Sequence, residues 1–474
     1  MKLKKLLKDL DVEVKGSREI EVTGISSHSQ FVSPGSLFIA KRGAAFDGTE
    51  FIPKAIEAGA LAIVTDIYNP FLQGVVQIIT PNITALEGLL AKRYYQIDQH
   101  PLFLVGITGT NGKTTTTYLI HHLLPYCGLM GGVETIIGKQ RFLSQLTTAD
   151  VVTNHKMFKE MKEGGLKAAV MEVTSHALDQ NRVAEILFDV GVFTNFSQDH
   201  LDYHETMENY LEAKLKLFKQ SKDAIYNIDD PKAQKIGTGL TFGIDQAADL
   251  MAKNIHFTLE GTHFDFCAGN RTIPMKTPLV GKYNVYNCLA ALAVGIKKGE
   301  SLSAMQKKLA TFPGVPGRLE KINNPKNIHL FVDHAHTPEA LVKVLETLHQ
   351  LKKGKIITVF GCGGDRDKTK RPLMAEAAEK FSDQVIVTSD NPRSESPQDI
   401  CNDIIKGLSK EPFIEIDRRA AIERAIFMAH KNDIVLIAGR GHEGEQKIGG
   451  RRVPFDDRVV AREISHLTIQ SKDC

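Results

Sequence analysis

The chain has 474 residues, of which 42% are hydrophobic and 24% are charged, and its formal net charge is +3. A chain of this length and composition is globular and forms about three domains of ordinary size. So small a net charge gives no basic field, and we therefore expect no nucleic-acid partner.

Cysteine spacing and hydropathy exclude further classes. The six cysteines form no Cys-x-x-Cys pair, so neither a zinc site nor a disulfide framework is indicated. The opening stretch MKLKKLLKDLDVEVKG lacks the uninterrupted apolar core of a secretory signal. No apolar run reaches the roughly 18 residues that cross a bilayer. We therefore expect a cytoplasmic protein without a membrane span.

Apolar runs alternate with helix-period segments, which is typical of α/β domains. The first strands are expected at SLFIA (36–40) and ALAIVTD (60–66). Two seams follow, the polar YYQIDQHP (94–101) and the Pro- and Gly-rich TFPGVPGR (311–318). These seams predict a small N-terminal α/β domain, a central domain with a mostly parallel sheet and a C-terminal Rossmann-like domain, with the bounds 1–97, 98–316 and 317–474.

The stretch GITGTNGKTTTTYLI (106–120) follows an apolar strand expected at 102–108. It departs from the usual P-loop pattern, because Ile107 stands where the first glycine would be. A glycine-rich turn that leads into a helix presents free N–H groups to phosphate. Lys113 would reach the β- and γ-phosphates, and the Thr114 hydroxyl would hold Mg²⁺. The alternative is a plain strand–turn–helix joint.

The segment TMENYLEAKLKLF (206–218) has the period of an amphipathic helix. Lys214 lies in the middle of its apolar stripe, whereas Lys216 points the opposite way. Periodicity alone favours a lysine whose amine reaches back to water. Nearby strands are expected to end at Glu172 and near His200. The DHLDYH segment that contains His200 is equally compatible with a hydrolase metal site or a polar loop.

The four strands expected in the C-terminal domain all run into polar motifs, which are VDHAHT, GCGGDRD, TSDNPR and AGRGHE. Ligands of open α/β sheets bind beyond the carboxyl ends of the strands, so one crevice could collect all four motifs. The GCGGDRD motif is no dinucleotide fingerprint, because Arg366 occupies its final glycine position. Asp390-Asn391-Pro392-Arg393 is also compatible with an ordinary turn.

The shortened loop GTNGKTT resembles the ATP loop of the Mur ligases and their folylpolyglutamate synthetase relatives, which couple ATP cleavage to amide-bond formation. The resemblance extends over nearly the whole chain, through GKYNVYNCLAAL (281–292), GVPGRLE (314–320) and VDHAHTPEAL (332–341). It implies a P-loop ATPase-like central domain. The ATP contacts that it implies are Gly109, Thr110, Asn111, Gly112, Lys113, Thr114, Thr115, Asn284, Asn287, Arg318 and Asp333. His334 departs from the tyrosine usual in the family.

The same resemblance reverses the interpretation of Lys214. Tyr210, Ala213 and Lys214 match the family's Y-x-x-A-K helix, whose lysine is carbamylated to N6-carboxylysine. The implied catalytic set is Lys113, Glu172, His200 and Lys214. The implied ligands of two Mg²⁺ ions are Thr114, Glu172, His200 and the Lys214 carbamate, a hard and mostly oxygen shell. Two cations would neutralise the anionic γ-phosphate and carboxylate that must meet.

The first domain resembles the family's uridine-diphosphate-binding domain. SSHSQFVSPGSLFIA matches its signature through Ser29, with His28 and Gln30 as departures. In LTTAD, Leu146 replaces the usual asparagine, and Thr174 stands where serine is commoner. The implied contacts to a UDP-sugar-peptide substrate are Ser29, Thr147, Thr148, Thr174, Gln180 and Arg182.

DNPR resembles the recognition sequence of Mur ligases that add meso-2,6-diaminopimelate. The implied contacts are Arg366, Asp390, Asn391, Pro392, Arg393, Gly439 and Glu443, and Arg440 replaces a usual lysine. We expect a monomeric ligase that uses ATP to join this amino acid to the D-glutamyl carboxylate of UDP-MurNAc-L-Ala-D-Glu. The alternatives are L-lysine addition, a folylpolyglutamate synthetase-like ligase, which would lack the first domain, and a nucleotide-gated binding protein without turnover.

Overall fold

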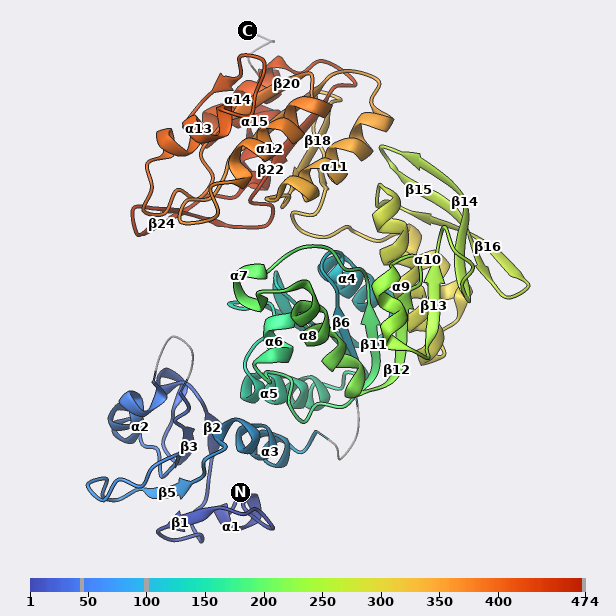
Figure 1. Cartoon of the computed structure of the whole chain (residues 1–474). Coiled ribbons are helices and arrows are strands. Elements are labelled where there is room, and N and C mark those ends of the chain that lie inside the picture. Colours follow the sequence, from blue (N-terminus) through green and yellow to red (C-terminus); the bar gives the residue numbers. More distant parts are fainter. Residues whose placement is uncertain (43–46, 98–101, 471–474) are drawn as a thin grey trace. The chain divides into compact units, whose positions relative to one another are not determined.

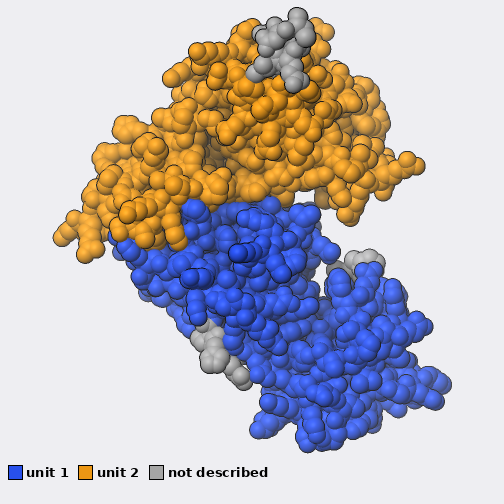
Figure 2. Space-filling view, turned by 180° about the vertical axis from the view of Figure 1, so that it is seen from behind, with its two compact units in different colours: residues 1–249, 290–302 blue, residues 250–289, 303–474 orange. Residues whose placement is uncertain are grey.

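The computed structural model describes residues 1–42, 47–97 and 102–470, so part of the seam expected at 94–101 lies outside the described residues. Residues 1–249 and 290–302 form one compact unit, and residues 250–289 and 303–474 form a second (Figure 2). We call them unit 1 and unit 2. Among the described residues, no helix is long and apolar enough to span a membrane.

Unit 1 begins with a five-stranded sheet in the order β1-β5-β4-β3-β2, in which only β1 is antiparallel to its neighbour. The expected strands at 36–40 and 60–66 are its β3 and β4. The strands are β1 (Glu13–Lys15), β2 (Gly24–Ser26), β3 (Ser36–Ile39), β4 (Ala62–Thr65) and β5 (Val76–Ile79). The helices are α1 (Leu3–Leu6), η1 (Ser29–Phe31), η2 (Gly48–Phe51), α2 (Ile52–Glu57) and α3 (Ile83–Tyr95).

The larger sheet of unit 1 carries the glycine-rich loop. Its strands in unit 1 run β13-β12-β11-β6-β10-β7-β8-β9, parallel up to β7 and antiparallel at β8 and β9. They are β6 (Phe103–Thr108), β7 (Cys127–Met130), β8 (Glu134–Ile137), β9 (Gln140–Leu143), β10 (Ala168–Glu172), β11 (Phe188–Phe193), β12 (Ser221–Asn227) and β13 (Leu240–Gly243). The helices are α4 (Lys113–Leu123), α5 (Val151–Glu163), α6 (Ser175–Asp179), α7 (Leu201–His204), α8 (Met207–Lys219) and η4 (Pro231–Ile236).

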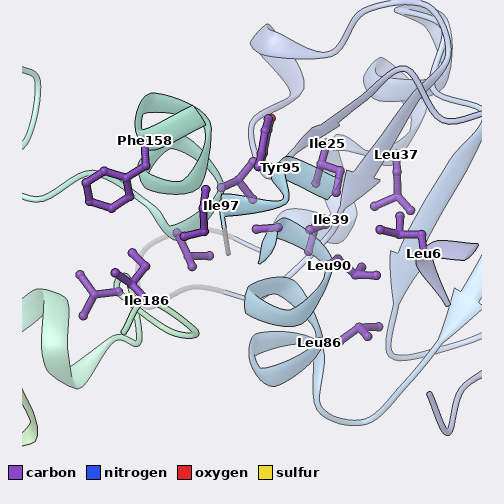
Figure 3. Close-up of a cluster of buried hydrophobic side chains, with 14 of the residues drawn as sticks. Leu6, Ile25, Leu37, Ile39, Leu86, Leu90, Tyr95, Ile97, Phe158 and Ile186 are labelled. Carbon is purple, nitrogen blue, oxygen red and sulfur yellow. The ribbon is translucent and has the colours of Figure 1, made fainter. Parts of the chain in front are cut away.

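One hydrophobic core joins the two sheets of unit 1. It runs from Leu6 and Leu37 through Leu90 to Phe158 and Ile186 (Figure 3). Helix α3 packs against α5 at the join. The first domain is therefore packed against the central sheet.

Unit 2 begins with antiparallel strands β14 (Leu250–Thr258), β15 (Gly261–Ala268) and β16 (Arg271–Thr277). Helix α9 (Lys282–Lys298) starts in unit 2 and ends in unit 1, and α10 (Leu302–Ala310) follows it. No sequence pattern predicted this three-stranded antiparallel element.

The C-terminal sheet of unit 2 runs β17-β18-β22-β19-β20-β21 and is parallel except at β17 (Figure 1). Its strands are β17 (Glu320–Ile322), β18 (His329–Asp333), β19 (Ile356–Phe360), β20 (Gln384–Val387), β21 (Phe413–Ile414) and β22 (Ile434–Ala438). Helices α11 (Pro338–Leu351), α12 (Lys370–Phe381), α13 (Pro397–Ile405), α14 (Arg418–Met428) and α15 (Asp457–Gln470) accompany it, and β23 (Glu445–Ile448) and β24 (Arg451–Pro454) form a separate hairpin. β19 and β22 are buried along their whole length, as expected for central parallel strands.

Candidate active site

The glycine-rich loop lies between β6 and the N-terminus of α4, as its sequence predicted. Gly109 and Gly112 have φ angles of +146° and +85°, which side chains rarely adopt. A Cβ atom at Gly109 would lie 1.9 Å from the Thr194 hydroxyl oxygen. The Asn111 N–H donates to Asn195 Oδ1 at 2.9 Å, and Thr194 Oγ1 donates to the Asn111 carbonyl at 2.6 Å. The residues after β11 therefore fix the shape of the loop.

Two lysines donate to the same carbonyl oxygen of this loop. Lys113 Nζ lies 2.8 Å from the Gly109 oxygen, and Lys214 Nζ lies 2.9 Å from it. Lys113 also donates to the Thr110 carbonyl at 2.9 Å. Lys113 therefore places its amine at the N-terminus of α4, where the backbone already favours anions.

Glu172, at the end of β10, faces the loop and is 1% exposed. Its Oε2 accepts a hydrogen bond from the Thr114 hydroxyl at 3.0 Å, and its Oε1 accepts one from the Gly132 N–H at 2.9 Å. The predicted neighbours Thr114 and Glu172 thus lie together. A hydroxyl and a carboxylate are hard oxygen donors of the kind that Mg²⁺ prefers, so these two residues fit a magnesium ion.

Lys214 lies on α8, which begins where the Thr206 side chain caps the Asn209 N–H at 3.1 Å. The lysine is 1% exposed, and its amine lies over the Tyr210 ring at 4.3 Å from the centroid. Burial and the charge of Lys113 lower the pKa of Lys214 well below its ordinary value. The amine does not reach water, so the alternative of a lysine that snorkels does not apply. Lys216 points outward, with Nζ 2.8 Å from Asp179 Oδ1.

His200 is placed differently from the prediction. Strand β11 ends at Phe193, and His200 follows in a polar loop, with φ +52°, just before α7. Its ring packs edge-on against His176, with centroids 4.7 Å apart, and lies 5.9 Å from the Tyr210 ring. Among the residues that the structure describes, no three His, Cys, Asp or Glu side chains form a metal-binding group.

Four of the predicted substrate contacts form one hydrogen-bonded network in unit 1. Thr148 Oγ1 donates to the Glu172 carbonyl at 2.9 Å and lies 3.4 Å from Thr174 Oγ1, and Arg182 donates to the Thr148 carbonyl at 3.1 Å. Arg182 also donates twice to Gln180 Oε1, at 3.0 and 2.6 Å. These side chains therefore lie close to the metal-binding candidate Glu172.

The remaining two predicted substrate residues have a looser connection to this network. Thr147 lies beside Gly132, where an added Cβ would approach its hydroxyl to 3.0 Å. Ser29 begins η1 in the first domain and is half-buried. No described contact joins Ser29 to the Thr148 network.

In unit 2, the predicted nucleotide residues form two local groups. Asn284 and Asn287 are buried on α9, where Asn287 Nδ2 donates to Asn284 Oδ1 at 3.1 Å. Asp333, at the end of β18, accepts from the N–H groups of Leu319 and Ala335, and burial raises its pKa against the opposing charge of Arg318. The Arg318 Nε atom is buried without a hydrogen-bond partner.

The four polar motifs of the C-terminal domain meet beyond the carboxyl ends of β18, β22, β19 and β20, as the sequence predicted. The Gly439 N–H donates to the Asp333 carbonyl at 3.1 Å, and the Gly364 N–H donates to the Asn391 carbonyl at 2.9 Å. Asn391 Nδ2 donates to Glu443 Oε2 at 2.7 Å.

Two arginines of this domain lie beside the same glycine. A Cβ atom at Gly363 would lie 2.8 Å from Arg393 Nη1 and 3.9 Å from Arg366 Cγ. Arg393 Nη1 also donates to the Gly364 carbonyl. The two guanidinium groups thus come from different motifs, one after β19 and one after β20.

Acidic groups gather on the other side of Asn391. Gly439 has φ +114°, and a Cβ there would lie 2.6 Å from Asp390 Oδ2. Burial and the nearby Asp390 raise the pKa of Glu443, and the hydrogen bond from Asn391 opposes this. Arg440 is fully buried, with Nε 4.0 Å from Glu443 Oε2. Cationic and anionic groups therefore lie in one region, which suits an amino acid that carries both charges.

Sequence reasoning named Arg440 only as a departure from the family pattern, and it missed Gln446 as a part of this region. Arg440 donates to the Phe455 carbonyl at 3.0 Å, but its Nε and Nη1 have no hydrogen-bond partner. Gln446, on β23, is 6% exposed and donates to the Asp390 carbonyl. The only signal for Gln446 is a lone uncharged polar residue in the charged stretch HEGEQK.

Three regions of the chain match families of Mur ligase domains. Residues 21–91 match the Mur ligase family catalytic domain, residues 107–295 the Mur ligase middle domain, and residues 317–441 the Mur ligase glutamate ligase domain. The chain therefore belongs to the Mur ligase family and has its three-domain α/β fold.

The similar curated proteins share a particular name. The chain is 44% identical, over 98% of its length and 99% of the relative, to the UDP-N-acetylmuramoyl-L-alanyl-D-glutamate–2,6-diaminopimelate ligase of Chlamydia felis. It is 42% identical to the ligase of the same name from Geobacillus thermodenitrificans, over 93% of this chain and 94% of that one.

Solved structures agree. A structure of a ligase of this name superposes with a TM-score of 0.71 at 32% identity and 99% coverage of both chains. The MurF ligase from Thermotoga maritima in complex with ADP, at 21% identity, shares the fold with a TM-score of 0.66 over 95% of this chain and 98% of its own.

Proposed function

We propose that the chain joins meso-2,6-diaminopimelate to the D-glutamyl carboxylate of UDP-N-acetylmuramoyl-L-alanyl-D-glutamate, with cleavage of ATP to ADP and phosphate, in peptidoglycan synthesis. The relatives that bear this name match the chain over nearly its full length. The single observation that carries the choice of amino acid is the Arg393 guanidinium beside Gly363, with the side-chain stem of Arg366 next to the same glycine. A planar guanidinium matches a carboxylate with two parallel donors, and diaminopimelate has a carboxylate at its far end where lysine has none.

The first half-reaction is a phosphoryl transfer. An oxygen of the D-glutamyl carboxylate attacks the γ-phosphorus of ATP, the bond to the β,γ-bridging oxygen breaks, and ADP leaves. Lys113 lies where it would stabilise the charge on the transferred phosphoryl group. Thr114 and Glu172 would hold Mg²⁺, which supplies neutralisation of the phosphate charge. The Thr148–Arg182 network lies beside Glu172 and would orient the acceptor.

The second half-reaction forms the amide. The neutral amine of diaminopimelate attacks the carbonyl carbon of the acyl phosphate, and a tetrahedral intermediate forms. The carbon–oxygen bond to phosphate then breaks as the carbonyl returns, and the departing phosphate takes the proton that the nitrogen loses. Asp390 and Glu443 would bind an ammonium group, and Arg366 and Arg393 would bind the distal carboxylate. No step requires a covalent nucleophile from the protein.

We further propose that Lys214 is carbamylated and, with His200 and Glu172, holds a second Mg²⁺. Carbamylation needs a neutral amine, which burial and Lys113 favour at Lys214. The amine attacks CO₂ and loses a proton, and the resulting anion faces the cation of Lys113. The carbamate would supply an oxygen ligand that the unmodified amine lacks, and oxygen ligands are those that Mg²⁺ prefers.

The domain bounds and cellular setting complete the proposal. We place the UDP-substrate domain at 1–97, the ATP-binding domain at 98–316 and the amino-acid-binding domain at 317–474. These bounds enclose the matched regions. The cytoplasm is the compartment that holds ATP and the nucleotide-linked substrate, and a monomer holds every proposed contact within one chain.

The deciding experiment measures phosphate release with ATP and the UDP-dipeptide, with meso-diaminopimelate or L-lysine as the amino acid. We expect release that depends on diaminopimelate. The Arg393→Ala variant should lose about 2–5 kcal/mol of kcat/KM with diaminopimelate, because the substrate carboxylate is left unpaired. Lys353→Ala, at an exposed lysine of the same domain, is the control.

Each alternative gives a different result in this assay. A wild type that prefers L-lysine, or an Arg393→Ala variant that keeps its diaminopimelate rate, contradicts the assigned amino acid. ATP binding without phosphate release under any condition identifies a binding protein. Activity with a folate acceptor would indicate the folylpolyglutamate synthetase reaction.

A further inference from the structure

The β23–β24 hairpin lies against the loop of residues 390–393, which carries Arg393. The Lys447 N–H donates to Asn391 Oδ1 at 2.9 Å. The Arg393 N–H donates to the Lys447 carbonyl at 3.0 Å, and the Gly449 N–H donates to the Arg393 carbonyl at 2.7 Å. Arg393 also forms a parallel bridge with Ile448. The loop is therefore held by β23 and by the first residue of the hairpin turn.

Gln446 is the buried side chain of that strand. It is 6% exposed, whereas Glu445, Lys447 and Ile448 are exposed. Its Nε2 donates to the Asp390 carbonyl and lies 3.3 Å from the Ser389 hydroxyl. These contacts tie the start of the loop to the hairpin, while the backbone of β23 ties its end.

The conformation of Arg393 requires such support. Its φ angle is +53°, in the left-handed region that a residue with a Cβ rarely adopts. A backbone in this region persists when the surrounding structure holds it, and such residues gather at functional sites. The two backbone hydrogen bonds to Lys447 of β23 and to Gly449 of the hairpin turn supply that constraint. In this conformation the Arg393 guanidinium reaches the Gly364 carbonyl beside Gly363.

We propose that the β23–β24 hairpin sets the selectivity for the amino-acid substrate, and that Gln446 is a positioning residue that acts through Arg393. Gln446 fixes the carbonyl of Asp390 at the start of the loop. This sets the backbone direction of Asn391 to Arg393, so that the Arg393 guanidinium faces the distal carboxylate of the substrate. This inference rests on the proposed function, because it assumes that Arg393 binds the amino acid.

The test replaces the amide donor while keeping the size of the side chain. Gln446→Leu removes all polarity, and Gln446→Glu keeps the shape but lacks the donor. We expect each of the two Gln446 variants to raise KM for meso-diaminopimelate about tenfold, because the loss of one hydrogen bond typically weakens binding by about that factor. The kcat and the KM values for ATP and the UDP-dipeptide should stay within about twofold. Arg451→Gln, an exposed change on the same hairpin, should match the wild type.

A double-mutant cycle with Arg393→Ala separates positioning from general structural support. If Gln446 acts through Arg393, Gln446→Leu causes little further loss in the Arg393→Ala background. The inference is wrong if both Gln446 variants have the wild-type KM for diaminopimelate. It is also wrong if Gln446→Leu raises KM for diaminopimelate by the same factor in the wild type and in Arg393→Ala, or if the KM values for all three substrates rise equally. The proposed function is judged separately, on the wild type and on Arg393→Ala, where Gln446 is intact.

Discussion

The carbonyl oxygen of Gly109 accepts from both Lys113 and Lys214, which makes the environment of each lysine depend on the other. If both amines were charged, they would repel each other strongly, because Lys214 is buried and water does not screen its charge. A carbamate at Lys214 reverses the sign of that interaction, because the new anion then faces the Lys113 cation. The lowered pKa of Lys214 avoids that repulsion in the unmodified chain, and the carbamate would replace it with an attraction.

The carbamylation of Lys214 is directly observable. We expect a ¹³C NMR carbamate signal when the protein is equilibrated with ¹³C-bicarbonate, and its loss in Lys214→Ala. Lys214→Ala should also lose most ligase activity, and acetate should restore part of it by filling the vacated space. The matched control is Lys216→Ala, on the same helix but exposed and paired with Asp179. Full activity of Lys214→Ala at limiting Mg²⁺ would contradict the proposal.

Lys113 should matter for phosphoryl transfer and not for folding. Lys113→Ala is expected to lose about 3 kcal/mol or more of transition-state stabilisation, since no other residue of the loop carries a positive charge. Acyl-phosphate formation, measured by trapping with hydroxylamine, should disappear while the circular dichroism spectrum is kept. Normal trapping in a correctly folded variant would assign the loop a structural role.

At the scale of elements, Arg371 of α12 ties the loop that follows residues 390–393 to α13. Its guanidinium is fully buried and donates to Glu395 at 2.9 and 3.0 Å and to Asp403 at 2.9 Å. The Asp365 N–H donates to Glu395 Oε1 at 2.6 Å. The Arg371 guanidinium and this N–H lower the pKa of Glu395 to about 2. One ion-paired group thus supports both arginine-bearing loops.

This ion pair predicts a pH dependence of stability. Because the folded-state pKa of Glu395 lies below its unfolded value, its contribution is fully present above about pH 4.5 and is lost as the pH falls toward 2. Glu395→Gln should therefore unfold at a lower urea concentration than the wild type at pH 7. The difference should shrink between pH 5 and pH 3. An equal difference at every pH would show that the charge of Glu395 contributes nothing.

Local sequence patterns predicted the elements that depend on neighbouring residues. The strand before the glycine-rich loop, the helix with Lys214 and the four C-terminal strands all lie within a few residues of their expected bounds. The position of His200 was not predicted, because polar residues after Phe193 bind the loop at Asn111 and end the strand early. The β23 contacts were equally hidden, since they join residues about 55 positions apart and use, apart from the Asn391 side chain, backbone groups that every residue has.

At the scale of the molecule, the structure divides the residues proposed for ATP between two compact units, with Gly109–Thr115 in unit 1 and Asn284, Asn287, Arg318 and Asp333 in unit 2. The family resemblance assigned all of them to one ATP-binding site, but it could not show which of them belong to the same compact unit. Composition likewise predicted three domains and gave no sign that the first is packed against the second. That packing depends on which apolar faces meet, and periodicity shows only that such faces exist.

The join within unit 1 depends on a glycine. Gly88 is buried on α3, and a Cβ atom there would lie 2.9 Å from the Ala184 Cβ of the central domain. Four residues later, Lys92 Nζ pairs with Glu185 Oε2 at 3.1 Å. The absence of a side chain at Gly88 therefore lets α3 approach residues 184–185 closely.

Gly88→Leu should force the two domains of unit 1 apart. We expect a loss of about 1–3 kcal/mol in the free energy of unfolding, because a close-packed contact is overfilled. Ala85→Leu adds the same side chain at an exposed position of the same helix and should change stability by less than about 0.5 kcal/mol. Urea unfolding followed by circular dichroism measures both.

Steady-state kinetics adds a functional reading, since the proposed UDP-substrate contacts include Ser29 in the first domain and Arg182 in the central one. Gly88→Leu should accordingly raise KM for the UDP-dipeptide and leave KM for diaminopimelate unchanged. Equal stability of the two leucine variants would show that the domains of unit 1 do not depend on this contact.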